Sequence, residues 1–306
     1  MTYKVLITGG SGLLGSNLVK LMEDEFEVHA VICSHGMKFK KSQVHNVDIT
    51  EGSEFAKTAV KVGPQFIIHT AALTNVDYCE THRDEAWKTN VVGTKNVIAA
   101  ARETKSKTIY ISTDSVFDGK RGMYTEDDSP NPLNYYAFTK LEGEKAVSGS
   151  GLPYLIVRTN IYGWNAQKKA SIAEWIRSTL EKKNKITLFS DIFFTPILVN
   201  NLSDAMVEIM EKDLQGLYHV AGSERCSKLQ FGLILAEIFD LDKKLIEPIK
   251  LNDKNLEAER PRDPSLSVEK IKRLIKTELL DVREGLKNFK YLLNNGYVEE
   301  LRKCLA

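Results

Sequence analysis

The sequence predicts an α/β protein with a doubly wound parallel sheet and a smaller C-terminal α/β lobe. Apolar, β-prone runs alternate with helical patterns from Tyr3 to Arg158, which is typical of a parallel sheet with helices on both faces. A glycine-rich turn, Gly9–Gly15, joins the first such run to the first helical pattern. Beyond Gly163 the rhythm changes and the predicted strands become short, which indicates the separate lobe.

The N-terminal stretch has the order strand, glycine turn and helix that a dinucleotide pyrophosphate requires. Residues 3–8 are apolar and β-prone, and residues 14–22 carry apolar side chains at helical spacing. Glycines let the backbone approach phosphates closely, and a helix N-terminus presents unpaired N–H groups to negative charge. Gly9, Gly12 and Gly15 therefore predict a Rossmann-type dinucleotide site, and a glycine-rich turn without a ligand is the alternative.

Composition describes an ordinary globular chain. Its 306 residues, 42% hydrophobic and 27% charged, allow one large domain or a domain with an appended lobe. A net charge of +1 gives no reason to expect nucleic acid or a membrane surface as a partner. The start shows no secretory pattern and no apolar run approaches membrane-spanning length, so we expect a cytoplasmic protein. The four cysteines are scattered, which predicts free thiols and no metal site.

The second predicted strand, residues 27–32, bears on the choice of dinucleotide. In such folds an acid at its end usually binds the adenosine ribose 2′-hydroxyl. Here the strand runs into Cys33-Ser34-His35-Gly36, and Lys38, Lys40 and Lys41 follow. Cations without a carboxylate at this place favour the 2′-phosphate of NADP, with NAD as the alternative; a solvated basic loop is the third interpretation.

The next elements alternate as the fold requires: an edge strand over 44–49, a helix over 51–61, a buried strand over 64–69 and a helix over 83–103. Asp48, at the end of the edge strand, is placed where an adenine amino group could be met. Residues 70–72 continue the buried strand with small side chains, which leave room for a flat ligand or for tight packing. Asn90 is locally unfavourable in a helix, so it either holds a neighbouring loop or strand or faces solvent.

The remaining predicted elements are a strand over 107–112, a helix from 135, a strand over 152–158, helices over 172–183, 201–212 and 227–239, short strands over 185–189, 217–220 and 245–249, and a mixed-charge helical tail. We assign residues 1–162 to a dinucleotide-binding domain and 163–306 to a substrate-binding lobe, with roughly 186–222 packing back on the sheet. The segment Glu259–Pro264 holds two prolines and two arginines. This stiff cationic segment suits an anionic ligand, although a solvated loop is the commoner use.

Tyr136 and Lys140 form the only Tyr-x-x-x-Lys in the sequence and project from one face of a predicted helix. They follow a strand ending in Ser112-Thr113, on the carboxyl side of the sheet where ligands collect. A nearby ammonium lowers the pKa of a tyrosine, so Tyr136 can give a proton to a carbonyl oxygen as hydride reaches its carbon. Thr113 would hydrogen-bond that oxygen, and Lys140 would also bind the nicotinamide ribose. The alternative is a structural tyrosine and a surface lysine.

These motifs resemble, in their order, those of the extended short-chain dehydrogenases/reductases: Thr8–Gly15, Asn90–Thr94, Ser112-Thr113 and Tyr136 with Lys140. More narrowly, residues 111–119, 139–145, 194–196 and 260–263 resemble the dTDP-4-dehydrorhamnose reductase family. The resemblance extends to about Lys272. It implies reduction of the 4-keto group of a nucleotide-linked deoxysugar by NADPH or NADH, with conversion of dTDP-4-dehydrorhamnose to dTDP-rhamnose as the narrowest reading.

The resemblance also implies roles for individual residues. Thr113, Tyr136 and Lys140 would be catalytic, and Thr113, Asp114, Asn160 and Arg262 would lie on the substrate side. The residues expected to line the cofactor are Gly9, Gly12, Leu13, Leu14, Asp48, Ile49, Ala71, Ala72, Leu73, Asn90, Ile111, Tyr136 and Lys140. The chain departs from the family pattern at Ser115, Ala137 and Ile161, where the family often has Tyr, Gly and a nearby Trp. These positions flank the sugar nucleotide, so the sugar and the base stay open.

Two other functions stay open as well. A nucleotide-sugar epimerase would use the same triad and retain its NAD tightly. The resemblance extends to the regulatory β subunit of methionine adenosyltransferase, in which this fold serves for binding, so a non-catalytic regulatory subunit is the second alternative. The sequence does not specify the oligomeric state, for which a homodimer is one arrangement.

Overall fold

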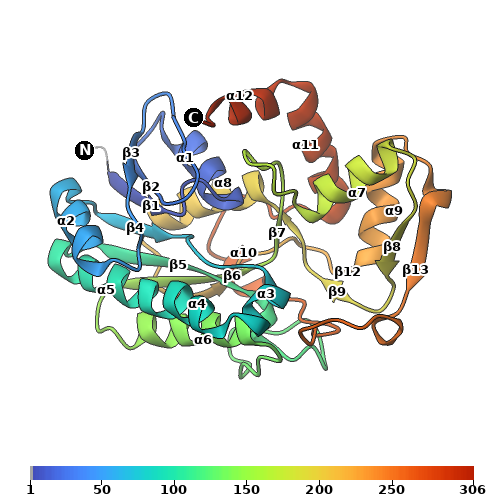
Figure 1. Cartoon of the computed structure of the whole chain (residues 1–306), viewed down its shortest axis with the longest axis horizontal. Helices are drawn as coiled ribbons and strands as arrows, with labels where there is room; N and C mark the ends of the chain where they lie inside the picture. The colour runs from blue at the N-terminus through green and yellow to red at the C-terminus, as the bar shows by residue number, and fades with distance from the viewer. Residues whose placement is uncertain (1–2) are drawn as a thin grey trace.

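A seven-stranded sheet forms the centre of the computed structural model, which describes residues 3–306 of the chain (Figure 1). All neighbouring strands are parallel, in the order β11-β6-β5-β4-β1-β2-β3. The strands are β1 (Lys4–Thr8), β2 (Glu27–Ile32), β3 (Gln43–Asn46), β4 (Phe66–His69), β5 (Lys107–Thr113), β6 (Tyr154–Thr159) and β11 (Gly216–His219). The chain runs outward from β1 to β3 and then crosses to β4 on the other side of β1. This topology confirms the predicted doubly wound Rossmann-type fold and places a ligand-binding crevice at the carboxyl ends of β1 and β4.

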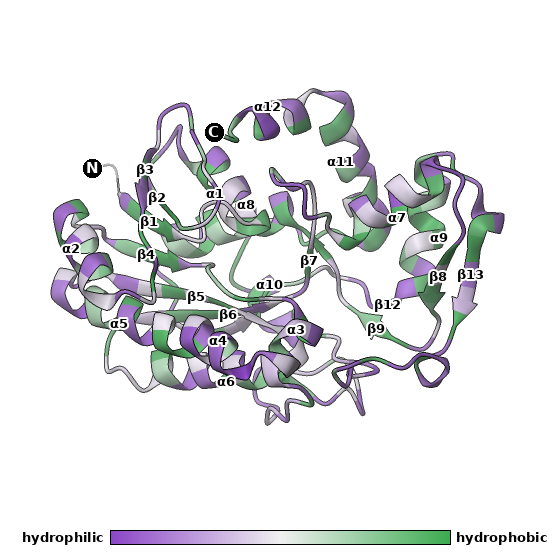
Figure 2. Cartoon of the chain, viewed as in Figure 1, coloured by the Kyte–Doolittle hydropathy of each residue, from purple (hydrophilic) through white to green (hydrophobic). Residues whose placement is uncertain are grey.

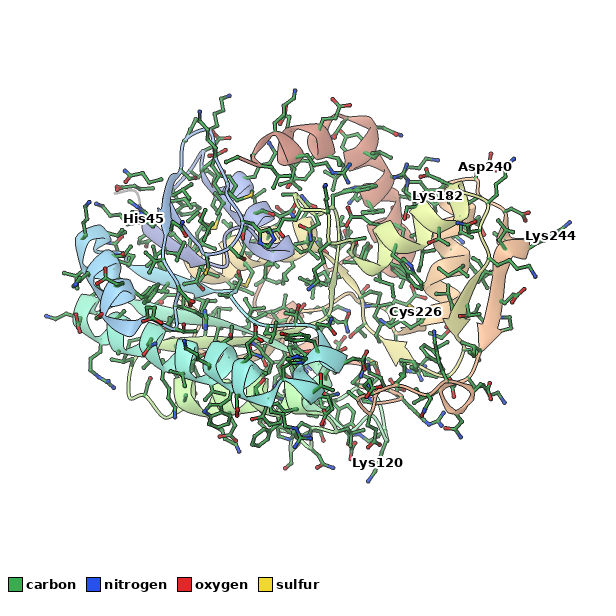
Figure 3. The ribbon with its side chains drawn as sticks, viewed as in Figure 1. His45, Lys120, Lys182, Cys226, Asp240 and Lys244 are labelled. Carbon is green, nitrogen blue, oxygen red and sulfur yellow. The ribbon has the colours of Figure 1, made fainter. Side chains whose placement is uncertain are left out.

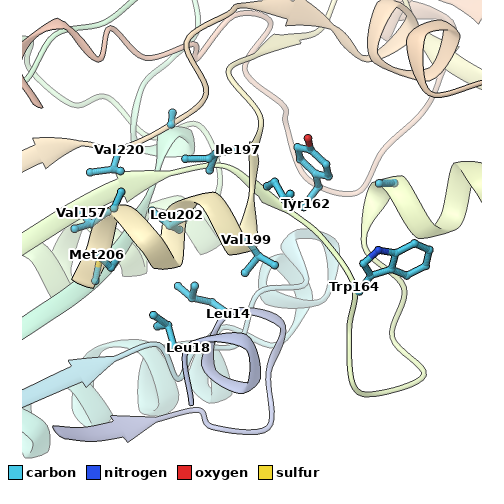
Figure 4. Packing of buried hydrophobic residues seen from close by; sticks show 14 of the residues in the cluster. Leu14, Leu18, Val157, Tyr162, Trp164, Ile197, Val199, Leu202, Met206 and Val220 are labelled. Atoms are coloured by element: carbon cyan, nitrogen blue, oxygen red, sulfur yellow. The ribbon is translucent and has the colours of Figure 1, made fainter. Parts of the chain in front are cut away.

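Helices cover both faces of the sheet, and the residues between the layers are apolar (Figures 1 and 2). One face carries α2 (Gly52–Val62), α5 (Gly93–Thr104) and α6 (Tyr135–Ser148), and the other carries α1 (Leu13–Met22) and α8 (Val199–Glu211). On the second face, Leu14 and Leu18 of α1 approach Leu202 and Met206 of α8 above Val157 of β6 (Figure 4). Helix α1, which follows the glycine turn, therefore packs against both the sheet and α8.

The predicted helix over 83–103 is present as one uninterrupted helical run, which a π-helical turn divides into three elements. They are α4 (Arg83–Trp87), the π-helical turn η1 (Lys88–Val92) and α5. Asn90 lies inside η1 and is buried. Wider π-helical turns often occur at functional sites, and here the turn carries the polar side chain that the pattern singled out. A further short helix, α3 (Val76–Thr81), was not predicted.

Two strand ends also differ from prediction. Strand β4 ends at His69, because the backbone N–H and the hydroxyl of Thr70 both donate to the carbonyl oxygen of Thr8, at 3.3 and 2.6 Å. The chain then turns toward the glycine turn instead of extending. Strand β3 ends before Asp48, whose carboxylate accepts a hydrogen bond from the Thr50 N–H at 2.8 Å and so forms a turn.

The lobe is built from short strands in pairs, backed by helices. Its strands are β7 (Ile161–Tyr162), β8 (Ile186–Phe189), β9 (Phe193–Phe194), β10 (Ile197–Leu198), β12 (Cys226–Ser227) and β13 (Ile246–Ile249), and its helices include α7 (Ile172–Glu181) and α9 (Lys228–Ile238). Strand β8 pairs with β13, β9 with β12 and β7 with β10. Within the segment 186–222, β8 thus belongs to the lobe. Strand β11 belongs to the central sheet, and α8 packs on one face of that sheet. The division at residue 162 stays a prediction.

Of the three C-terminal helices, the last returns to α1 in the N-terminal half, whereas the first packs on β11 and the second on α9 (Figure 1). They are α10 (Glu269–Lys272), α11 (Val282–Asn294) and α12 (Tyr297–Lys303). The hydroxyl of Tyr297 donates to the Asn17 side chain at 2.6 Å, and Lys38 N donates to Cys304 O at 2.7 Å. The end of the chain thereby supports the loop that follows β2. Within residues 3–306, no helix combines the length and the apolar character needed to cross a bilayer.

Candidate active site

The turn between β1 and α1 is shaped as a cradle that side chains would fill. Gly9 has φ +70°, and a Cβ there would lie 2.7 Å from Ala71 N; a Cβ on Gly15 would lie 2.2 Å from Gly9 O. Helix α1 begins after Gly12 without a side-chain cap, so its first N–H groups face the cradle. Uncapped N–H groups beside closely approaching backbone fit a pyrophosphate. The structure thus brings the motif glycines and Ala71 together.

Two of the residues expected to line the cofactor have side chains that are buried in the core. Leu14 packs between α1 and α8, and Ile49 packs against Gly93 of α5. Only their backbone atoms can reach a ligand. Leu13 and Ile111 are partly buried, and both pack against the edge of the core.

The crevice has a second wall made by residues 71–73. Leu73 is held by Asn90, which accepts from the Leu73 N–H at 2.8 Å and donates to the Leu73 carbonyl at 3.1 Å. Asn90 also donates to the Thr139 hydroxyl at 2.9 Å, and Thr139 donates to the Tyr136 carbonyl at 2.7 Å. Both N–H donors of Asn90 and one acceptor direction of its oxygen are thus used by protein partners. The side chain positions the crevice wall and α6, so it can assist cofactor binding indirectly.

The carboxyl end of β2 differs from the sequence expectation in one respect. Asp48 lies beside Cys33, hydrogen-bonded to its thiol, and raises the thiol pKa together with burial. A carboxylate is therefore available near the end of β2, although it comes from a later part of the chain. Its contact with the adenosine stays a prediction.

The three lysines after β2 are not equivalent. Met37 and Phe39 are buried, so Lys38 and Lys40 alternate with them and are exposed. Lys41 instead forms an ion pair with Asp24 at 2.5 Å. Lys38 and Lys40 are the cations of this loop that can meet a 2′-phosphate.

At the end of β5 the Thr113 side chain lies close enough to the Tyr136 phenol to influence its pKa. Burial of the ring raises the pKa of Tyr136, and hydrogen bonding with Thr113 works in the opposite direction. Lys140 is not among the causes of this shift, so the expectation that its ammonium lowers the tyrosine pKa is not met by the protein groups alone. Helix α6 is held at its start by Asn134, whose side chain accepts from Ala137 N at 2.9 Å.

Lys140 is buried one turn further along α6. Its Nζ lies 4.0 Å from the centroid of the Tyr110 ring and has no hydrogen-bonded acceptor among residues 3–306. Burial lowers its pKa to about 7, and the nearby Glu144 carboxylate opposes this. The buried His69 is hydrogen-bonded to the Thr8 hydroxyl at 2.7 Å. Burial lowers the pKa of His69 to about 3, so this histidine is neutral and structural.

A buried ion pair supports the catalytic helix. Arg158 of β6 donates twice to Glu144, at 2.9 and 2.7 Å, and the Ser112 hydroxyl donates to the same carboxylate at 2.5 Å. Both charged side chains are buried. These bonds tie α6, which carries Tyr136, to the ends of β5 and β6.

A cavity of about 350 Å³ opens between this edge of the sheet and the lobe. Asp114 and Asn160 line it, and Asn160 donates to the Asp114 carboxylate at 2.6 Å. Burial raises the pKa of Asp114. Three cations that were not predicted as site residues, Lys228, Lys254 and Arg260, line the same cavity. Lys228 follows a helix cap in the lobe and has no local signal, because only the folded lobe brings it beside Asp114.

Arg262 lies elsewhere. It binds Asp191 and Asn252 and lines a neighbouring outer cavity of about 810 Å³. Arg260 lines both cavities and is held by Asp77 at 2.8 Å and by the Ala258 carbonyl. The structure therefore does not bring Arg262 together with Asp114 and Asn160, and Arg260 occupies the position nearer to them.

The loop after β7 closes over the glycine turn. Gln167 donates to the Ser11 carbonyl at 2.5 Å, and Lys169 donates to the Thr74 hydroxyl at 3.1 Å. Neither Gln167 nor Lys169 was predicted as a site residue, because the contact joins segments about 100 or more positions apart.

Comparisons with known proteins agree with this geometry. The family model described as the RmlD substrate binding domain matches residues 3–294. The probable low-salt glycan biosynthesis reductase Agl14 of Haloferax volcanii is 31% identical over 271 residues, covering 87% of this chain and 90% of that protein. Methionine adenosyltransferase 2 subunit beta of Bos taurus is 30% identical over 293 residues, covering 93% and 86%.

A solved structure extends the similarity to the whole fold. The dTDP-4-dehydrorhamnose reductase of Bacillus anthracis, in complex with NADP, has a TM-score of 0.85 at 27% identity, covering 95% of this chain and 99% of that one. The match includes both the sheet and the lobe. The chain belongs to the RmlD substrate binding domain family, within the extended short-chain dehydrogenases/reductases that its motifs resemble.

Proposed function

We propose that this protein is an NAD(P)H-dependent reductase of the 4-keto group of a nucleotide-linked deoxysugar. The observation that carries the proposal is the proximity of Tyr136 to Thr113, one helical turn from the buried ammonium of Lys140, between the glycine cradle and the lobe cavity. The similarity to a dTDP-4-dehydrorhamnose reductase favours dTDP-4-dehydrorhamnose as the substrate and dTDP-rhamnose as the product.

The chain's own groups complete the reduction. When bound, the reduced nicotinamide supplies a hydride to the carbonyl carbon of the sugar. Tyr136 donates its phenolic proton to the carbonyl oxygen, which becomes the new hydroxyl, and Thr113 hydrogen-bonds this oxygen and orients it. Lys140 binds the nicotinamide ribose and, when charged, stabilises the phenolate that remains.

The protonation state of Tyr136 suits the reductive direction. Burial raises its pKa, so at neutral pH the phenol carries the proton that reduction consumes. A dehydrogenase working in the opposite direction needs the phenolate instead. The protein groups alone therefore favour a proton donor.

NADP is the cofactor we propose, with NAD as the alternative. The Bacillus anthracis reductase is in complex with NADP, and Lys38 and Lys40 lie exposed after β2, where a 2′-phosphate is held in such folds. Asp48 beside Cys33 is the feature that favours NAD.

A regulatory role is the second candidate, because methionine adenosyltransferase 2 subunit beta is nearly as similar in sequence as the archaeal reductase. The epimerase alternative predicts that NAD stays bound through purification. Each of these functions makes a different prediction for the purified protein.

The test is oxidation of NADPH, followed by its absorbance, with dTDP-, UDP- and GDP-linked 4-keto-6-deoxysugars. We expect substrate-dependent oxidation that is fastest with a dTDP-sugar. If no sugar supports oxidation of NADPH and a partner protein co-purifies, the reductase function is wrong and the regulatory role is favoured. A tightly bound NAD in the purified protein would favour the epimerase.

A further inference from the structure

An ammonium group without a protein partner lies in the wall of the lobe cavity. Lys228 is the first residue of α9 and lines the cavity of about 350 Å³ together with Asp114 and Asn160. It forms no ion pair and no hydrogen bond through Nζ among residues 3–306. None of the motifs assigns it a role, and its neighbours Asp114 and Asn160 carry only the role that the resemblance implies.

The position of this ammonium is fixed by the lobe. Ser227 caps α9 by accepting from Gln230 N at 3.0 Å, and β12 pairs with β9, which brings Phe194 next to Lys228. Nζ of Lys228 lies 3.1 Å from the centroid of the buried Phe194 ring. Burial lowers the pKa of Lys228 to about 8, and the Asp114 carboxylate opposes this shift. A preorganised charge of this kind suits recognition, because little conformational entropy is lost when it binds a ligand.

The same cavity is also lined by an acceptor, Asp114. Asp114 accepts hydrogen bonds from Asn160 at 2.6 Å and from the hydroxyls of Thr113 and Ser115 at 3.2 Å each. These bonds fix the carboxylate next to Thr113, at the edge where the keto group is proposed to lie. Oδ1 accepts from both hydroxyls, whereas Oδ2 accepts from Asn160 alone and keeps one acceptor direction.

A cation and a carboxylate that face the same cavity without pairing can be bridged by a hydroxyl group, which accepts from one and donates to the other. The other walls are apolar, formed by side chains such as Ile172, Leu188, Ile192 and Phe193. The cationic groups Arg260 and Lys254 line both this cavity and the outer one. Asp114, Asn160 and Lys228 therefore form a polar part of the cavity, which fits sugar hydroxyls. The two cations shared with the outer cavity form a second part, which fits a diphosphate.

We propose that Lys228 recognises the sugar ring, by donating a hydrogen bond to a ring hydroxyl whose proton Asp114 accepts. The residue thereby selects sugars that carry this hydroxyl over their deoxy analogues. The assignment of a sugar to this cavity rests on the proposed function, whereas the recognition of a hydroxyl by Lys228 can be measured by binding alone.

The experiment measures binding calorimetrically, in the presence of NADP⁺, so that it does not depend on turnover. The ligands are dTDP-glucose, its 2-deoxy and 3-deoxy analogues, and dTDP. The variants are Lys228→Met, Lys228→Gln, which keeps an uncharged donor, and Lys244→Met, an exposed lysine on the far side of the lobe from Cys226 and β12 (Figure 3).

We expect Lys228→Met to weaken dTDP-glucose binding about 10- to 100-fold, the effect of losing a charge-assisted hydrogen bond. Lys228→Gln should fall between the wild type and Lys228→Met. One deoxy analogue should bind the wild type weakly and be insensitive to Lys228→Met, and dTDP and NADP⁺ binding should change less than about 3-fold. Lys244→Met should behave as the wild type.

Three results overturn the proposal. An equal loss of dTDP affinity in Lys228→Met assigns the ammonium to the diphosphate. Unchanged dTDP-glucose binding in a folded Lys228→Met protein leaves the lysine only its contact with Phe194. Equal sensitivity of both deoxy analogues to the substitution excludes recognition of a particular hydroxyl. If no sugar supports NADPH oxidation but these binding differences appear, the reductase function fails and the recognition role of Lys228 stands.

Discussion

Glu144, at the ends of β5 and β6, and Lys228, in the lobe cavity, are charged side chains held in opposite ways. At the catalytic edge, Glu144 receives three hydrogen bonds from Arg158 and Ser112, and all of these side chains are buried in the frame of α6, β5 and β6. In the lobe cavity, Lys228 has no such bond among the described residues, and Arg260 is partly exposed. The bonds to Glu144 hold α6 in place beside β5 and β6. The ammonium of Lys228 remains available to a ligand.

The comparison teaches where chemistry and specificity are encoded. A buried frame of Glu144, Arg158 and Ser112 ties α6, which carries Tyr136, to β5 and β6. A cavity with unpaired donors can recognise different sugars when single residues change. We therefore expect substitutions at the catalytic edge to have larger effects than those in the lobe.

The largest effect should follow Tyr136→Phe. Removing the phenolic hydroxyl removes the proton donor, and we expect kcat to fall on the order of 10³-fold, equivalent to about 4 kcal/mol. NADPH binding, measured by its fluorescence, should stay within a few-fold of the wild type. Unchanged turnover would show that Tyr136 is not the proton donor. It would also contradict the expectation that substitutions at the catalytic edge have larger effects than those in the lobe.

Glu144→Gln tests the frame itself. The substitution leaves the buried Arg158 without its carboxylate, and we expect the free energy of unfolding to fall by about 3 kcal/mol. Glu142→Gln on the same helix is the matched control, because Glu142 pairs with the exposed Lys145 at 2.7 Å and should contribute less than about 1 kcal/mol. Denaturant titration measures both, and equal effects would show that burial does not distinguish the two pairs.

Short motifs could be chosen from the sequence, whereas the frame that supports them and the full lining of the cavity could not, and the reason is physical. Gly9, Tyr136 and Lys140 belong to motifs a few residues long, which spacing selects, but Glu144 and Arg158 meet only in the folded sheet. The cavity depends on segments far apart in the chain: Lys228 approaches Asp114 only because β12 pairs with β9. No spacing rule could choose Arg260 over Arg262, since both lie in one irregular segment.

Lys140→Met should separate stability from activity. Burial lowers the pKa of Lys140 from 10.5 to about 7, so the unfolded chain holds this proton more tightly than the folded protein. The buried charge therefore lowers the free energy of unfolding. This destabilisation is fully present below pH 7 and is lost as pH rises from 7 to 10.5. We expect the variant to be more stable than the wild type by on the order of 2 kcal/mol at pH 7, while turnover falls.

The pH dependence is the check on this explanation. The stability difference between Lys140→Met and the wild type, measured by denaturant titration, should be largest at pH 7 and below and should shrink toward pH 10. A difference that does not vary with pH would assign the effect to packing against Tyr110 and not to the buried charge.

In the lobe, Arg260→Gln should raise the Michaelis constant for the nucleotide-sugar about 10-fold, equivalent to about 1.4 kcal/mol, with kcat little changed. Arg262→Gln is the control, because Arg262 is engaged with Asp191 and Asn252 at the outer cavity. Steady-state kinetics measures both. A larger effect at Arg262 would return the substrate role to the residue that the sequence indicated.

The smallest effect is expected at the adenosine end of the crevice, where the lysines are exposed to solvent. Replacing Lys38 and Lys40 by Ala should raise the Michaelis constant for NADPH by a few-fold more than that for NADH, since exposed charges contribute about 1 kcal/mol or less. Lys41→Ala should leave the ratio unchanged, because this ammonium is paired with Asp24. Asp48→Asn should act in the opposite sense and weaken NADH binding more, if its carboxylate meets the ribose hydroxyl. A double variant that weakens both cofactors equally would show that the loop is only a solvated basic segment, and that recognition by unpaired charge is confined to the lobe.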